Sequence, residues 1–110
     1  MWAKASGNYD AKAFVNFDGR LASCPGGWCT IRSQYNVSGV FRASTGRYVI
    51  YFSTVMPSSN YAVLFSGNND INIHGLVNHA QNAGYVDMAF GNASNGVPVD
   101  PSIVSAAIFQ

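Results

Sequence analysis

The sequence predicts an all-β fold, either an antiparallel β-sandwich or an open barrel of about seven short strands. Short apolar runs rich in Val, Ile, Tyr and Phe are interrupted repeatedly by Gly, Ser, Asn or Pro. Runs of this length favour strands over helices. Ser44-Thr45-Gly46 separates two of these runs, and a short connection containing Gly is typical of a β-hairpin. The length of 110 residues suits one domain.

The first ten residues show no periodicity and are predicted to form a docking arm or linker, followed by a single β-domain over 11–110. Trp2 and Tyr9 are costly to leave in water, so the arm is expected to lie against a neighbouring protein. Ala11–Phe17 alternates between two faces and predicts the first strand.

A loop is expected over 21–29 because it contains Pro25-Gly26-Gly27. Cys24 and Cys29 are the two cysteines of the chain, and their spacing allows a local disulfide. Free thiols or a bridge to another subunit are the alternatives. Two cysteines without a second ligand pair nearby do not indicate a metal site.

The second half predicts further strands. Apolar runs over 61–65 and 85–90 are each expected to form one, whereas 66–84 is the most polar segment and predicts an irregular strand or two with exposed loops. Residues 91–101 are rich in turn formers. The last run, 102–109, is apolar on both faces, which favours a central or interface strand.

Composition points to an oligomer. Charged residues make up 10% of the chain and hydrophobic residues 48%, whereas a typical domain carries about 25% charged residues. Part of the surface is therefore expected to be covered by other subunits. The alternative is a monomer whose surface is wetted by Ser, Asn and Gly.

Several functions are disfavoured. The net charge is +1 with no basic run, which argues against nucleic acid as a partner. No run approaches the length of a membrane-spanning helix, so no membrane insertion is expected. The first residues lack the apolar core of a signal peptide, which indicates synthesis in a cytoplasm. No catalytic motif, paired carboxylates or phosphate loop is present, and neither an enzyme nor a cofactor is expected. The spacing of His74 and His79 favours histidines in solvated loops over ligands of a metal ion.

Five strings in order resemble one known family: A-K-A-F-V-N-F-D-G from Ala11, I-R-S-Q-Y-N-V-S-G-V from Ile31, T-G-R-Y-V-I-Y-F-S-T-V-M-P from Thr45, N-Y-A-V from Asn60 and D-P-S-I-V-S-A-A-I-F from Asp100. They are similar to a domain of tail fibres and other appendages of tailed bacteriophages, where it usually forms the tip. The resemblance is weakest over 66–99, and the two cysteines depart from its pattern.

The resemblance implies a structural protein of the virion, a homotrimeric β-module that meets the host surface. In that role the arm would bind other virion proteins. The alternative is a purely structural decoration or adaptor protein on capsid, neck or baseplate, without receptor binding. A bacterial lectin unrelated to phages is a third reading.

Carbohydrate is the expected receptor, because amides and carboxylates bind sugar hydroxyls and aromatic rings stack on sugar faces. The same polar residues also occur in turns for local reasons. The candidate receptor-binding residues are Trp28, Asn68, Asn69, Asp70, His74, Asn78 and Tyr85.

Overall fold

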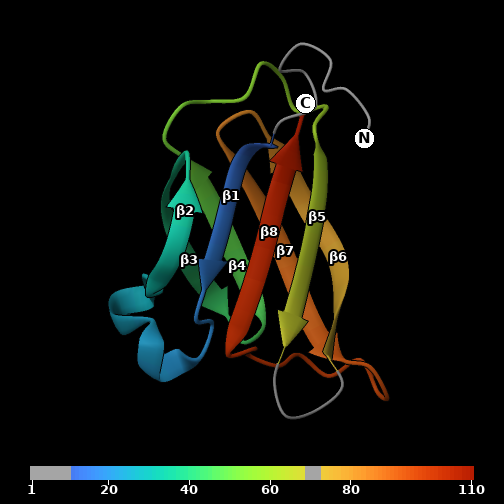
Figure 1. Ribbon diagram of the computed structural model, residues 1–110. Coiled ribbons are helices and arrows are strands. Elements are labelled where there is room, and N and C mark those ends of the chain that lie inside the picture. The colour runs from blue at the N-terminus through green and yellow to red at the C-terminus, as the bar shows by residue number, and fades with distance from the viewer. Residues whose placement is uncertain (1–10, 69–72) are drawn as a thin grey trace, which may run out of the picture.

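The chain folds as two four-stranded antiparallel sheets packed face to face (Figure 1). The computed structural model describes residues 11–68 and 73–110, with backbone alone for 73–79. The all-β prediction is confirmed, and of its two forms the structure is the sandwich. Eight strands are described, one more than expected. In this part of the chain, no helix has the length and apolar character needed to cross a bilayer.

The first sheet has the strand order β2-β1-β8-β5. Its strands are β1 (Ala11–Phe17), β2 (Ile31–Tyr35), β5 (Ala62–Asn68) and β8 (Ile103–Phe109). β8 lies between β1 and β5 in the middle of the sheet, which confirms the central strand predicted at the end of the chain.

The second sheet has the order β3-β4-β7-β6 and lies behind the first in Figure 1. Its strands are β3 (Val37–Ser44), β4 (Arg47–Phe52), β6 (Ile73–Asn82) and β7 (Tyr85–Asn92). β3 and β4 form the predicted hairpin, in which Ser44 pairs with Arg47. Gly46 has φ of 74°, and a Cβ there would lie 2.5 Å from the carbonyl oxygen of Phe90. This turn therefore requires glycine.

Asn36 carries the chain from the first sheet to the second. It has φ of 57°, a value that Asn adopts more readily than most residues. Its side chain donates hydrogen bonds to the carbonyl oxygens of Lys12 and Thr54 and accepts one from the Thr54 N–H at 2.7 Å. The corner consequently divides the 30–44 segment into β2 and β3.

The expectation of an irregular strand or two over 66–84 is confirmed in part. The segment contains the ten-residue β6, which is longer than expected, pairs with β7 and is interrupted by two register shifts. β6 is an edge strand, and edge strands commonly carry polar residues and bulges that discourage pairing with other chains. Its polar sequence is thus compatible with regular backbone pairing.

The core lies between the sheets and follows the alternation of the strands. In β1, Ala13, Val15 and Phe17 are buried while Phe14 is exposed, as the sequence predicts. Facing them are Tyr48 and Ile50 of β4. The other large, fully buried side chains include Val40, Val86, Met88, Phe90, Val104 and Ile108.

Candidate functional site

A disulfide-closed loop brings Trp28 to the outer face of the second sheet. Cys24 and Cys29 are joined within the chain, which among the alternatives left open by the sequence is the local disulfide. Two short 3₁₀ turns, η1 (Leu21–Ser23) and η2 (Pro25–Gly27), build the loop. Gly26 and Gly27 have positive φ, and the Trp28 N–H donates to the Pro25 carbonyl oxygen at 3.2 Å.

Two glycines let this loop lie close to β3. A side chain on Gly27 would collide with the ring of Phe41. A Cβ on Gly39 would lie 2.9 Å from the indole of Trp28. The Cys29 N–H donates to the Val40 carbonyl oxygen at 2.9 Å, so the loop is bonded to β3 as well as packed on it.

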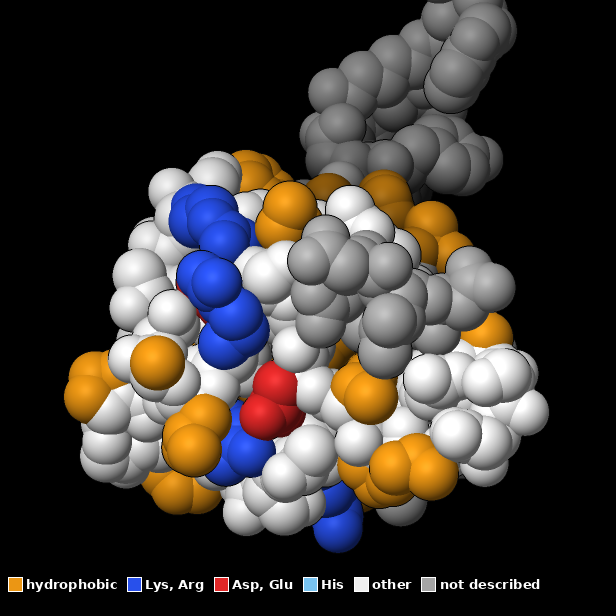
Figure 2. Space-filling model, turned by 90° about the horizontal axis from the view of Figure 1, so that it is seen from below, with side chains coloured by type: hydrophobic (Ala, Val, Ile, Leu, Met, Phe, Trp, Pro, Cys, Tyr) orange, Lys and Arg blue, Asp and Glu red, His pale blue; other side chains and the backbone are white. Residues whose placement is uncertain are grey.

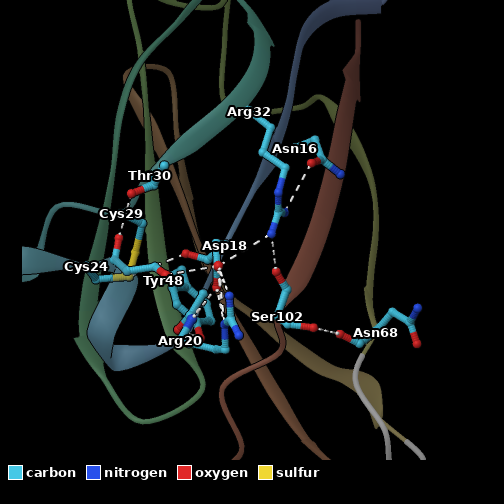
Figure 3. A network of polar contacts seen from close by, with 12 residues as sticks. Asn16, Asp18, Arg20, Cys24, Cys29, Thr30, Arg32, Tyr48, Asn68 and Ser102 are labelled. Carbon is cyan, nitrogen blue, oxygen red and sulfur yellow. Dashed lines mark hydrogen bonds and ion pairs between the residues drawn. A yellow bond between two sulfur atoms is a disulfide. The ribbon is translucent and has the colours of Figure 1, made fainter.

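The base of the loop is held by Asp18, whose carboxylate is almost fully buried (Figure 3). It accepts hydrogen bonds from the backbone N–H and the guanidinium of Arg20, both at 3.0 Å, and from the Ser23 hydroxyl at 2.9 Å. The Asp18 N–H donates to the Thr30 carbonyl oxygen across the base. The guanidinium of Arg20 outweighs the effect of burial and holds the pKa of Asp18 well below its ordinary value.

Arg32 adds a second cation near Asp18, and links the loop to the first sheet. Its guanidinium lies 3.5 Å from the Asp18 carboxylate and donates to the Ser102 carbonyl oxygen at 2.8 Å. Figure 2 views the molecule from this end and shows acidic side chains lying against basic ones. Arg20 and Arg32 both pair with the Asp18 carboxylate, so these charges hold the loop in place and do not form a binding site for ions.

Trp28, Tyr51 and Tyr85 form a line of rings across the second sheet, which we call the aromatic row. Trp28 covers Gly39 of β3, Gly39 pairs with Tyr51 of β4, and Tyr51 pairs with Tyr85 of β7. The ring centroids of Trp28 and Tyr51 are 5.9 Å apart, and those of Tyr51 and Tyr85 are 6.0 Å apart. Trp28 is 53% exposed and Tyr51 36%.

Phe41 supports the aromatic row from the side. Its ring and the indole of Trp28 form a T-shaped pair with centroids 5.1 Å apart. The indole is therefore packed against Phe41 and Gly39, while more than half of its surface faces solvent. A ring fixed in this way is available for stacking without a large loss of side-chain freedom.

An ion pair borders the aromatic row on the same face. Arg47 of β4 donates to Asp87 of β7 with two bonds, at 2.8 and 3.2 Å. Arg47 and Asp87 each follow the side-chain alternation of Tyr51 and Tyr85 on their strands. The two charges balance, so this part of the face has no net charge over β4 and β7.

The predicted receptor-binding residues are only partly brought together. Trp28 and Tyr85 share one face because Tyr51 lies between them. Asn68 is exposed but belongs to the first sheet, where its carbonyl oxygen accepts a bond from the Ser102 hydroxyl at 3.2 Å. His74 and Asn78 lie in β6, whose side chains at 73–79 are not described. Trp2, Tyr9, Asn69 and Asp70 lie outside the described residues.

The sequence reasoning missed Tyr51 and Phe41. β4 reads R-Y-V-I-Y-F, so apolar or aromatic residues occupy both of its faces. The alternation groups Tyr51 with Arg47, and a charged residue usually marks the solvent face. That signal was present in the sequence, and would have assigned Tyr51 to the surface.

The outer face of the first sheet holds a shallow apolar groove of about 380 Å³. Phe14 of β1 and Leu64 of β5 form its walls, and they are 40% and 65% exposed. Between them lie the small side chains of Ser105 and Ala107 on β8. We call this feature the apolar groove; it faces away from the aromatic row, because the two lie on opposite outer faces of the sandwich.

Among the side chains that the structure describes, those of 11–68 and 80–110, no group of three or more His, Cys, Asp or Glu residues is arranged to hold a metal ion. Comparison of the chain with protein-family models, with curated proteins and with solved structures finds no match.

Proposed function

We propose that this chain is a structural protein of a bacteriophage virion, a tail-fibre or appendage tip that binds carbohydrate on the host surface. The five sequence strings that resemble phage appendage tips support the virion assignment. The aromatic row is the observation that carries the binding function, since the exposed rings of Trp28 and Tyr51 and the half-buried ring of Tyr85 suit the apolar faces of sugars.

The surroundings of the row add to this proposal. The disulfide, the turn hydrogen bond and the two tight glycines fix the position of Trp28 before any ligand arrives. Preorganisation reduces the entropy lost on binding, which matters for ligands that offer few strong contacts. Arg47, on the same face of β4 as Tyr51 and 43% exposed, supplies a guanidinium that can donate to sugar hydroxyls.

The apolar groove supports a homotrimer. Exposed Phe14 and Leu64 flank small residues, so a neighbouring copy can approach the sheet closely and bury both side chains. In this arrangement the first sheet faces other subunits, and the second sheet faces the host.

Adsorption to bacterial cells tests the binding function. The fluorescently labelled protein is incubated with a panel of bacterial strains, before and after periodate oxidation of their surface glycans. We expect saturable binding to a subset of strains and its loss after periodate. A protein that adsorbs to no strain, or equally well after oxidation, would contradict the proposal.

A purely structural role is the second candidate, and the apolar groove is the observation that favours it. An exposed apolar face of this kind also suits permanent contact with another virion protein. Retention on purified capsid, neck or baseplate proteins, with no adsorption to cells, would favour this role over receptor binding.

A further inference from the structure

The aromatic row runs across the strands, not along one of them. Each step passes to the paired residue of the neighbouring strand, from Gly39 under Trp28 to Tyr51 and then to Tyr85. The two steps are of nearly equal length, 5.9 and 6.0 Å between ring centroids. Such regular spacing offers repeated stacking positions, whereas a site for a single terminal sugar needs one ring and a surrounding pocket.

The row lies on the outer surface of the second sheet, where Trp28 is 53% and Tyr51 36% exposed. Two described hollows of about 380 Å³ each, the apolar groove and one beside Asn36, are not lined by Trp28, Tyr51 or Tyr85. The exposed rings therefore offer a surface along which an extended ligand can lie.

The rings are turned relative to one another. The interplanar angle is 48° between Trp28 and Tyr51 and 52° between Tyr51 and Tyr85. A flat ligand surface, such as a crystalline polysaccharide, cannot lie against all three ring faces at once. A single chain can, because rotation about its glycosidic bonds turns each sugar relative to the next.

Charge narrows the choice of ligand. The cation of Arg47 is bound in two places by Asp87, so the face beside Tyr51 and Tyr85 carries balanced charge. A polyanionic chain would gain little net attraction there, because the Asp87 carboxylate already neutralises the Arg47 guanidinium. The binding of a neutral chain does not depend on a net charge at this face, and its hydroxyls can form hydrogen bonds with the exposed part of the ion pair.

We propose that the aromatic row binds a single, neutral polysaccharide chain laid across β3, β4 and β7, with successive sugars stacked on Trp28, Tyr51 and Tyr85. This inference rests on the proposed host-glycan function and specifies its ligand class. It explains why Trp28 is fixed so firmly: a loose ring would break the spacing on which recognition of a chain depends.

Affinity electrophoresis tests the ligand class. The probes are soluble neutral chains (dextran, mannan, laminarin and galactan), the polyanions alginate and hyaluronan, and, in a pull-down, crystalline cellulose and chitin. We expect retardation by at least one soluble neutral chain, with little dependence on salt. Preference for a crystalline solid, preference for a polyanion, or no retardation by any neutral chain would overturn the inference.

Tryptophan fluorescence tests the row itself, with fragments of increasing length from the chain that binds. Affinity should rise with each sugar up to the length that covers the three rings and then level off. Removal of one ring should weaken binding about five- to tenfold, measured by fluorescence for Tyr51→Leu and by affinity electrophoresis for Trp28→Ala, which lacks the reporting indole. Tyr51→Leu keeps an apolar side chain at this position, and thermal melting checks that the variant is folded. The fluorescence of Trp28 reports its binding. Equal affinity for one sugar and for longer fragments would refute the row.

Tyr35→Ala is the matched control, because Tyr35 is 57% exposed and stacks on Phe14 in the other sheet. It should bind the chain as the wild type does. Adsorption to cells separates the two proposals. If Trp28→Ala and Tyr51→Leu adsorb as the wild type does, the inference fails and the host-binding function stands; if the wild type does not adsorb, the function fails too.

Discussion

The hydroxyl of Tyr48 in β4 lies between Gly19, which follows β1, and Asp100, which precedes β8. It is 2.7 Å from the Gly19 carbonyl oxygen and 2.9 Å from the Asp100 carboxylate, in a side chain with no exposed surface. Burial, with the nearby Asp100 carboxylate, raises the pKa of Tyr48, so the phenol stays neutral and can donate. A Cβ at position 19 would lie 2.5 Å from this oxygen, so the position requires glycine.

Replacement of Tyr48 by Phe removes the hydroxyl and leaves the ring in the core. We expect the free energy of unfolding to fall by about 1 to 2 kcal/mol, since the single O–H donor that lies between the Gly19 carbonyl oxygen and the Asp100 carboxylate is lost. Urea unfolding followed by fluorescence measures the change. The exposed Tyr35→Phe is the control and should shift stability by less than about 0.5 kcal/mol. Equal effects of the two variants would contradict this account.

Two carboxylates make stability depend on acid pH. The Arg20 side chain lowers the pKa of Asp18 despite burial. Burial alone would raise the pKa of Asp100, but hydrogen bonds from Arg42, the Gly46 N–H and Tyr48 outweigh it and the pKa is lowered. Both values lie below the ordinary 3.8. The charged forms therefore stabilise the fold above about pH 4, and this is lost as pH falls through the folded-state pKa values.

The melting temperature should accordingly be level near neutral pH and fall steeply below about pH 4. Asp100→Asn should melt lower at neutral pH, because the ion pair with Arg42 is gone. Its further loss between about pH 4 and pH 2 should be smaller than that of the wild type, since one of the two titrating groups is absent. A melting temperature that stays level down to pH 2 in the wild type would rule out this coupling.

At the scale of elements, the conformation of the loop between β1 and β2 depends on the Cys24–Cys29 disulfide. The disulfide closes a small ring, so on the chain-entropy model it contributes about 2 kcal/mol. The double variant Cys24→Ser with Cys29→Ser should lose about this much stability. It should also lose binding to the aromatic row, because Trp28 lies within the closed ring.

Reductant provides the control for this prediction. It should lower the melting temperature of the wild type toward that of the double variant and leave the double variant unchanged. Fluorescence of the two tryptophans, measured alongside, reports whether the surroundings of Trp28 change. A wild type whose stability and fluorescence ignore reductant would show that the disulfide does not hold the loop.

The strands that the sequence predicted well are those with one apolar face. β1 was predicted with its observed bounds, because Ala13, Val15 and Phe17 alternate with polar or exposed neighbours. The hairpin turn at Gly46 was equally clear. In contrast, β6 was not recognised as one long strand, since an edge strand needs no continuous apolar face and pattern alone does not reveal its backbone pairing.

The candidate site was predicted in pieces. Trp28 and Tyr85 were singled out separately, on residue type and loop position. Their relation depends on Tyr51 and on the registers that place Gly39, Tyr51 and Tyr85 opposite one another. Registers are set by long-range pairing, which a single sequence does not show. Asn68 was grouped with them by its neighbourhood in the chain, yet it lies in the other sheet.

At the scale of the whole molecule, the apolar groove makes a prediction about assembly. Leu64→Glu places a charge on its wall and should convert the proposed trimer into monomers, with a threefold fall in mass by light scattering. Leu21→Glu is the matched control, because Leu21 is also 65% exposed but lies in η1. A wild type that is monomeric at all concentrations would contradict the trimer.

The two outer faces of the sandwich point in opposite directions. Subunits that meet through the first sheet must therefore turn their second sheets outward, each toward a different side of the assembly. The subunits of the proposed trimer could then bind different polysaccharide chains at the same time. Attachment would therefore strengthen sharply with the density of these polysaccharides on a cell. A sparsely coated bacterium would release such a particle, whereas a thickly coated one would retain it.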